Sequence, residues 1–234
     1  VVGIFQFTFA CDPLKINATI GMRKCMQQEQ KERHMVKQIS IISFVLALTS
    51  LMASVAEAHT GVGSTFGFAH GFGHPLGGVD HILAMVAVGM FAAHLGGRAL
   101  WLVPCCFVAM MAVGGTLGIS GVEVPFVEIG IAMSVIVLGA LVALQTSLPT
   151  SVAMGIVGFF ALFHGHAHGA EMPTDAGSLS YAAGFMLATT LLHIAGIALG
   201  LGLAKLASGY SKRVIQVGGG AMAAAGVGIL TGYI

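Results

Sequence analysis

The chain has 234 residues, of which 56% are hydrophobic and only 8% are charged, and its mean hydropathy is +0.93. A water-soluble core cannot hold so much apolar surface, so this composition excludes an ordinary soluble protein and indicates one embedded in lipid. The net charge of +1, without clusters of basic and aromatic residues, excludes a nucleic-acid-binding protein.

The N-terminal part differs from the rest of the chain. Residues 1–34 are polar, and we interpret them as an extension that is absent from the mature protein. Residues 35–58 follow the pattern of a secretory signal peptide, with an apolar stretch from Ile39 to Val55 and a cleavage site ending at Ala58. Cleavage there makes His59 the first residue, whose α-amine and imidazole together are a natural metal chelate. An uncleaved first helix is the alternative.

Six apolar windows follow residue 58, and each is close to the roughly 20 residues that cross a bilayer as a helix. Glycine, proline and charged residues separate the windows. The sequence therefore predicts an all-α fold, a polytopic membrane bundle of six transmembrane helices in one domain, residues 59–234. The windows lie at about 75–95, 99–119, 125–145, 150–168, 180–203 and 212–232.

The charged loop residues predict an orientation. If the mature chain starts outside, alternation places its Lys and Arg residues inside and three acidic residues outside, as the positive-inside rule requires. We therefore expect a bacterial inner-membrane protein with both mature termini in the periplasm. The basic residues are Arg98, Lys205, Lys212 and Arg213, and the acidic residues are Glu123, Glu171 and Asp175.

A first polar motif lies at the outer start of the first window. Its ionisable residues are His70, His74, Asp80 and His81. An aspartate inside a span costs a few kcal/mol unless it is paired, and such groups generally face a cavity or a bound ion. On a continuous helix His74 and His81 share one face, which Met85 extends. Pro75 and the glycines at 77 and 78 favour a broken helix start instead, which can expose ligands to a water-filled site.

A second polar motif, residues 163–171, lies at the outer end of the fourth window. At helical spacing His164, His168 and Glu171 fall on one side, whereas His166 points elsewhere. Because both motifs lie at the same membrane face, we expect them to meet. The glycines at 165 and 169 weaken this helix, which would allow His166 to swing in.

These residue types indicate a transition-metal site. Imidazole suits nickel, copper, zinc and iron, and carboxylates offset the charge of a dication. No thiolate-rich or Met-x-Met pattern supports copper(I), whereas N/O ligation fits Ni²⁺ or Co²⁺, and Zn²⁺ stays open. We interpret Cys105 and Cys106 as buried apolar residues rather than ligands, and we expect no organic cofactor.

Some further residues have two interpretations each. Glu128, just inside the third window, is either a site residue or a surface group near the interface. His193, in the fifth window, lies on a metal pathway or bonds a neighbouring helix. The residues on a possible metal pathway are His59, His70, His166, His193, Glu128 and Met85.

The sequence His-Pro-Leu-Gly-Gly-Val-Asp-His at 74–81, together with Phe-His-Gly-His-Ala-His-Gly-Ala-Glu at 163–171, resembles the HupE/UreJ family of bacterial nickel permeases. The resemblance covers nearly everything after the predicted signal peptide. It implies nickel uptake for hydrogenase or urease maturation. It also implies that the metal site consists of His74, Asp80, His81, His164, His168 and Glu171. Maturation proteins are then expected partners, and a homo-oligomer is compatible with the sequence.

Two other functions fit the same residues. One is a cobalt or zinc permease on the same scaffold, and the other is a non-transporting membrane metal chaperone or assembly partner. An enzyme is not expected, since the His-Glu-x-x-His signature of an intramembrane metalloprotease is absent.

Overall fold

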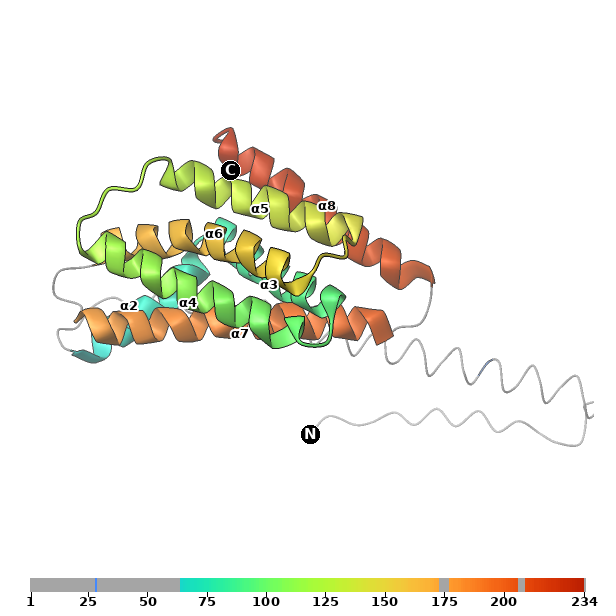
Figure 1. Ribbon diagram of the computed structural model, residues 1–234, viewed down its shortest axis with the longest axis horizontal. Helices are drawn as coiled ribbons and strands as arrows, with labels where there is room; N and C mark the ends of the chain where they lie inside the picture. The colour runs from blue at the N-terminus through green and yellow to red at the C-terminus, as the bar shows by residue number, and fades with distance from the viewer. Residues whose placement is uncertain (1–27, 29–63, 173–176, 206–208, 234) are drawn as a thin grey trace, which may run out of the picture. The chain divides into compact units, whose positions relative to one another are not determined.

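The computed structural model describes Gln28 and residues 64–172, 177–205 and 209–233. The predicted extension (apart from Gln28), the predicted signal peptide and His59 lie outside these ranges. Seven helices and no strand occur within them (Figure 1), so the all-α prediction is confirmed. The helices are α2 (Ser64–Gly77), α3 (Val79–Leu95), α4 (Ala99–Ile119), α5 (Val127–Leu144), α6 (Thr150–Ala170), α7 (Ser178–Lys205) and α8 (Gly209–Leu230).

Five of these helices, α4 to α8, are long and apolar enough to cross a membrane. The first predicted window is broken instead, because α2 and α3 meet at an angle of 83°. Gly78 between them has extended backbone angles (φ −100°, ψ 121°), and Pro75 lies in the last turn of α2. With its 17 residues, α3 is only about 25 Å long, less than the roughly 30 Å of a bilayer core. Counted as one span, the bent pair is the sixth, and its break lies where Pro75 and the glycines at 77 and 78 predicted a broken helix start.

Glycines in α4 and α6 bring the backbones of these two helices into direct contact. A Cβ at Gly165 would collide with the carbonyl oxygen of Met111, and one at Gly169 with that of Gly115. These glycines were expected to weaken α6, and they do not break it, because the helix is continuous over Thr150–Ala170. Glycine is required here for close helix packing, and the packing fixes which face of α6 points toward α3.

Helix α7 supports both halves of the bent pair. A Cβ at Gly71 of α2 would collide with the backbone of Tyr181, and one at Gly89 of α3 with the carbonyl oxygen of His193. With 28 residues, α7 is about 42 Å long, so it is long enough to contact α2 as well as α3. The bend is therefore held from the side by one continuous helix.

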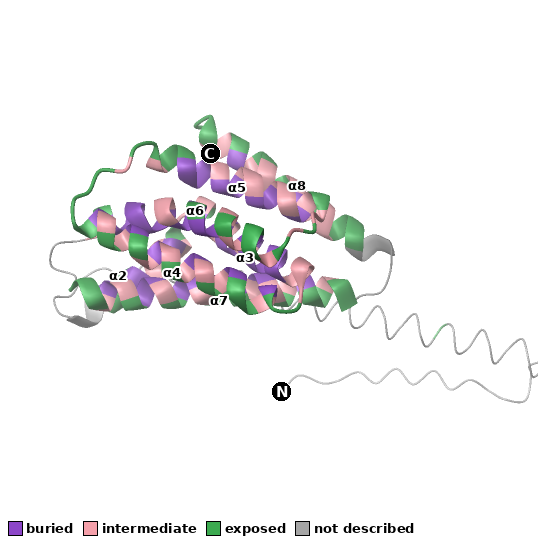
Figure 2. Cartoon of the chain, viewed as in Figure 1, coloured by how far each residue is buried: buried purple, intermediate pink, exposed green. Residues whose placement is uncertain are grey.

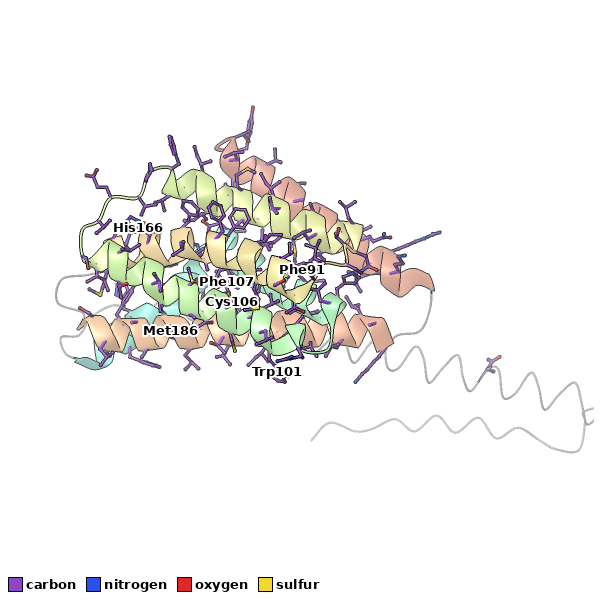
Figure 3. All side chains as sticks on the ribbon, viewed as in Figure 1. Phe91, Trp101, Cys106, Phe107, His166 and Met186 are labelled. Carbon is purple, nitrogen blue, oxygen red and sulfur yellow. The ribbon has the colours of Figure 1, made fainter. Side chains whose placement is uncertain are left out.

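The core lies around α3, α6 and α7, whereas α8 packs mainly on α5 at one edge of the bundle (Figures 1 and 2). Helix α4 turns Val103, Phe107 and Met111 inward. Cys105 is exposed and Cys106 is only partly buried, so the prediction that both are buried is wrong. Adjacent helical residues point about 100° apart, and Phe107, which follows Cys106 directly (both are labelled in Figure 3), already occupies the inward face of α4.

Candidate metal site

Three potential ligands converge where α2 ends beside the end of α6. His74 comes from α2, and His168 and Glu171 come from α6 and its C-terminal cap. One ligand atom of each lies within 4.8 Å of those of the other two. The Nε2 atom of His74 lies 3.1 Å from Oε2 of Glu171, to which it donates a hydrogen bond, and the rings of His74 and His168 are 4.6 Å apart. We call these three residues the mouth cluster.

Asp80 and His81, at the start of α3, form the next layer. Asp80 Oδ1 accepts hydrogen bonds from the backbone N–H of His81, at 2.8 Å, and from its ring Nδ1, at 2.9 Å. A Cβ at Gly78 would lie 2.6 Å from that oxygen, so the glycine leaves the room that the carboxylate fills. Because Nδ1 donates its proton to Asp80, Nε2 of His81 carries the lone pair. This nitrogen is buried without a hydrogen-bond partner among the described residues.

His164 lies one helical turn from His168 and is fully buried, with 0% of its surface exposed. Its ring packs edge-on against His81 at 4.6 Å, and the ring of His81 is 4.2 Å from that of His168. Ser134 Oγ donates to the carbonyl of Ile131 and lies 2.8 Å from Nε2 of His164. The serine hydroxyl therefore accepts from Nε2–H, which leaves Nδ1 of His164 as a free base.

An open pocket of about 380 Å³ gives access to these residues. Its walls come from both halves of the bent pair, from α5 and from α6. Besides Glu171, they include four imidazole or carboxylate residues of the two motifs. The lining residues are His74, Gly77, Gly78, Asp80, His81, Glu128, Ile131, Ala167, His168 and Glu171. The site therefore combines several imidazoles and carboxylates in one open pocket.

Comparisons with known proteins agree with these motifs. The family described as HupE / UreJ protein matches residues 46–229. The chain belongs to the HupE/UreJ family. It is also 50% identical to Protein HupE of Rhizobium leguminosarum bv. viciae over 194 residues, which cover 82% of this chain and 98% of that protein. No solved structure matches the chain.

In this HupE/UreJ chain the predicted meeting of the two motifs is confirmed by the contacts of His74, His81, His164, His168 and Glu171. Their role as metal ligands stays a prediction. Glu128, for which two interpretations were open, lines the pocket. His70 is exposed and lies beside the ring of His74, 6.2 Å away, outside the pocket lining.

Three other predicted residues lie away from the pocket. His166 turns to the α4–α5 connection, where its Nε2 donates to the carbonyl of Val122 at 2.7 Å (Figure 3). His166 therefore lies on a different side of α6 from His164 and His168, as the helical spacing predicted. The alternative, that His166 turns toward the site, finds no support. Met85, four residues after His81 on α3, and His193 on α7 are both buried, with 0% and 1% of their surfaces exposed.

Sequence reasoning missed two side chains of the site. Ser134 fixes the protonation of His164, although it stands 30 positions away, and its only signal was a lone hydroxyl in a very apolar window. Tyr181 packs beside His70 and His74 with ring distances of 6.1 Å. Its position depends on the bend between α2 and α3, which determines where α2 crosses α7.

Proposed function

We propose that this protein imports Ni²⁺ across the bacterial inner membrane, from the periplasm to the cytoplasm, to supply hydrogenase or urease maturation. The observation that carries the proposal is the convergence of His74, His168 and Glu171 in an open pocket, with Asp80 and His81 directly behind them. Imidazole and carboxylate ligands suit Ni²⁺, and also Co²⁺ and Zn²⁺. Membership of the HupE/UreJ family supports nickel as the first choice.

The openness of the site suits a cargo rather than a resident ion. The side chain of Glu171 is 57% exposed and that of His74 is 30% exposed, so a bound ion at the mouth cluster stays in contact with water. His74 and Glu171 are joined by a hydrogen bond of 3.1 Å. A dication that binds to both side chains replaces this hydrogen bond, because a ring nitrogen that coordinates a metal has no proton to donate. Exchange between the hydrogen bond and the metal keeps binding reversible.

Entry of the ion does not require a second energy source. An inside-negative membrane potential favours inward movement of one charge by about 2.3 kcal/mol per 100 mV, so the corresponding value for a dication is about 4.6 kcal/mol. Electrically driven uptake through a selective binding site therefore satisfies the energetics of import.

The test compares ⁶³Ni accumulation in cells that lack other nickel importers. Glu171→Gln removes a mouth carboxylate but keeps its size, and we expect uptake at low nickel to fall by about tenfold or more. Glu123→Gln is the matched control, since this exposed acid lies in the α4–α5 connection and does not line the pocket. Unlabelled Co²⁺ and Zn²⁺ added in competition establish the selectivity.

Purified protein in liposomes that contain a metal-sensitive dye completes the test. Dye quenching by external Ni²⁺ is the expected result. A protein that binds nickel but produces no flux is a metal chaperone or assembly partner, and this result would overturn the proposal. Equal uptake by Glu171→Gln and wild type would show that the mouth cluster has no role in the proposed import.

A further inference from the structure

His193 is a buried base that the pocket does not explain. It lies in the middle of α7 with 1% of its surface exposed. Neither of its ring nitrogens has a hydrogen-bond partner among the described residues. Leaving a buried polar group unpaired is strongly unfavourable, and an apolar residue would fill the same space without that penalty. The imidazole therefore lacks the protein partner that a buried polar group ordinarily has.

His193 is connected to His164 through a shared neighbour. The ring of Phe107 lies 5.8 Å from the ring of His164 and 5.1 Å from that of His193. Phe107 belongs to α4, His164 to α6 and His193 to α7, so three helices place these rings in one part of the core. Since Ser134 accepts the Nε2 proton of His164, the Nδ1 of His164 is an unpaired base, and one of the two unpaired nitrogens of neutral His193 is a second base on the other side of Phe107.

The contact between α3 and α7 gives the depth of His193. Its carbonyl lies against Gly89, which follows His81 by eight residues, or about 12 Å along α3. Helical side chains lean toward the N-terminus of their helix. The imidazole of His193 therefore leans back toward the level of His81 and His164. One turn nearer the mouth, Thr189 Oγ1 bonds Sδ of Met111 at 3.7 Å, so this face of α7 carries polar groups at successive turns.

We propose that His193, with His164, forms a second binding station for the transported divalent cation, below the mouth cluster. The proposal rests on the proposed function, because it describes the next step of the same ion. An ion that leaves Glu171 and Asp80 loses water on its way into the core, and neutral imidazoles replace that water without bringing charge into the membrane. Two dications so close together repel each other strongly, so the ion occupies the mouth cluster and this station in turn.

The first experiment separates capture from passage. In ⁶³Ni uptake, His193→Leu is expected to lower the maximal rate by about tenfold or more, while purified protein keeps the nickel affinity of the mouth cluster within about twofold of wild type. A maximal rate near that of wild type would overturn the proposal. Loss of mouth binding in this variant would also overturn it, because His193 would then be a structural residue. Absence of uptake by the wild type would instead overturn the proposed function.

The second experiment detects contact with the ion itself. His193→Cys places a thiolate at the station, and we expect added Co²⁺ to produce a thiolate-to-cobalt charge-transfer absorption in the purified protein. Leu191→Cys is the matched control, because Leu191 lies two residues away on the outward face of α7 and is 46% exposed. Wild-type protein corrects for the native cysteines. No absorption beyond that of Leu191→Cys would show that the ion does not reach His193.

Discussion

Two imidazoles of the site, those of His81 and His164, each have one ring nitrogen fixed as a donor, because a neighbouring oxygen accepts its proton. Asp80 accepts from Nδ1 of His81, and Ser134, whose own proton goes to Ile131, accepts from Nε2 of His164. Each imidazole is thus held with one nitrogen as a donor and the other as a base. Partners that orient metal-binding histidines in this way typically change metal affinity by about 10–100-fold when they are removed.

This assignment predicts a graded effect of substitutions at Asp80. Asp80→Ala removes the acceptor, so the ring of His81 can rotate and its Nε2 can take the proton, and nickel affinity should fall by about 10–100-fold. Asp80→Asn keeps an acceptor oxygen, so its affinity should lie between wild type and Asp80→Ala. Equilibrium binding of ⁶³Ni to the three purified proteins measures the order. An equal loss in both variants would mean that the charge of Asp80 matters and its hydrogen bond to His81 does not.

At this scale the sequence predicted a large share of the site. The spacing of His164, His168 and Glu171 on one helix was enough to group them and to separate His166. It could not predict Ser134 or Tyr181, because helical periodicity orders residues within one helix and says nothing about which helix lies opposite. Nor could it decide the role of Glu128, whose place in the pocket wall depends on how α5 packs beside α6.

Helix elements position these side chains through the contacts of their glycines. The windows for α4 to α8 followed from hydropathy, since long apolar runs have few alternatives in lipid. Helix α2 was not predicted, because Ser64–Gly77 is rich in glycine and histidine and includes a proline. Tertiary contact with α7 overrides this weak propensity. The glycines of α6 were interpreted as weak points, and their packing role could only be seen with α4 in place.

The packing of α4 on α6 predicts different effects for two glycines of the same helix. Gly165→Ala places a Cβ against the carbonyl of Met111, whereas Gly155→Ala meets no atom within 4 Å. Gly165→Ala should destabilise the protein by about 1–3 kcal/mol, the usual cost of overpacking. It should also reduce uptake, because α6 carries His164 and His168. Gly155→Ala should retain stability and uptake. Thermal unfolding in detergent and ⁶³Ni uptake measure both, and equal behaviour of the two variants would contradict the close packing.

For the whole molecule, the charged residues mark the two ends of the bundle. The mouth cluster lies where α3 begins and α6 ends. Arg98 follows the other end of α3, and Lys205 ends α7. Lys212, in the first turns of α8, lines a second pocket of about 280 Å³ together with His94 near the end of α3. The positive-inside rule therefore predicts that this second pocket faces the cytoplasm and that the mouth cluster faces the periplasm.

This orientation is tested by single cysteines in a variant from which the native cysteines have been removed. Glu123→Cys lies in the α4–α5 connection, where Val122 contacts His166 of α6, so it marks the mouth end. Ser147→Cys is exposed between α5 and α6 and marks the opposite end. A membrane-impermeant thiol reagent added to spheroplasts should label position 123 and spare position 147, and inverted vesicles should give the reverse. Labelling of position 147 from outside would show that the mouth cluster faces the cytoplasm. The membrane potential would then oppose movement of a dication from the mouth cluster to the exterior. The proposal that the mouth cluster takes up the ion from the periplasm for import would have to be abandoned.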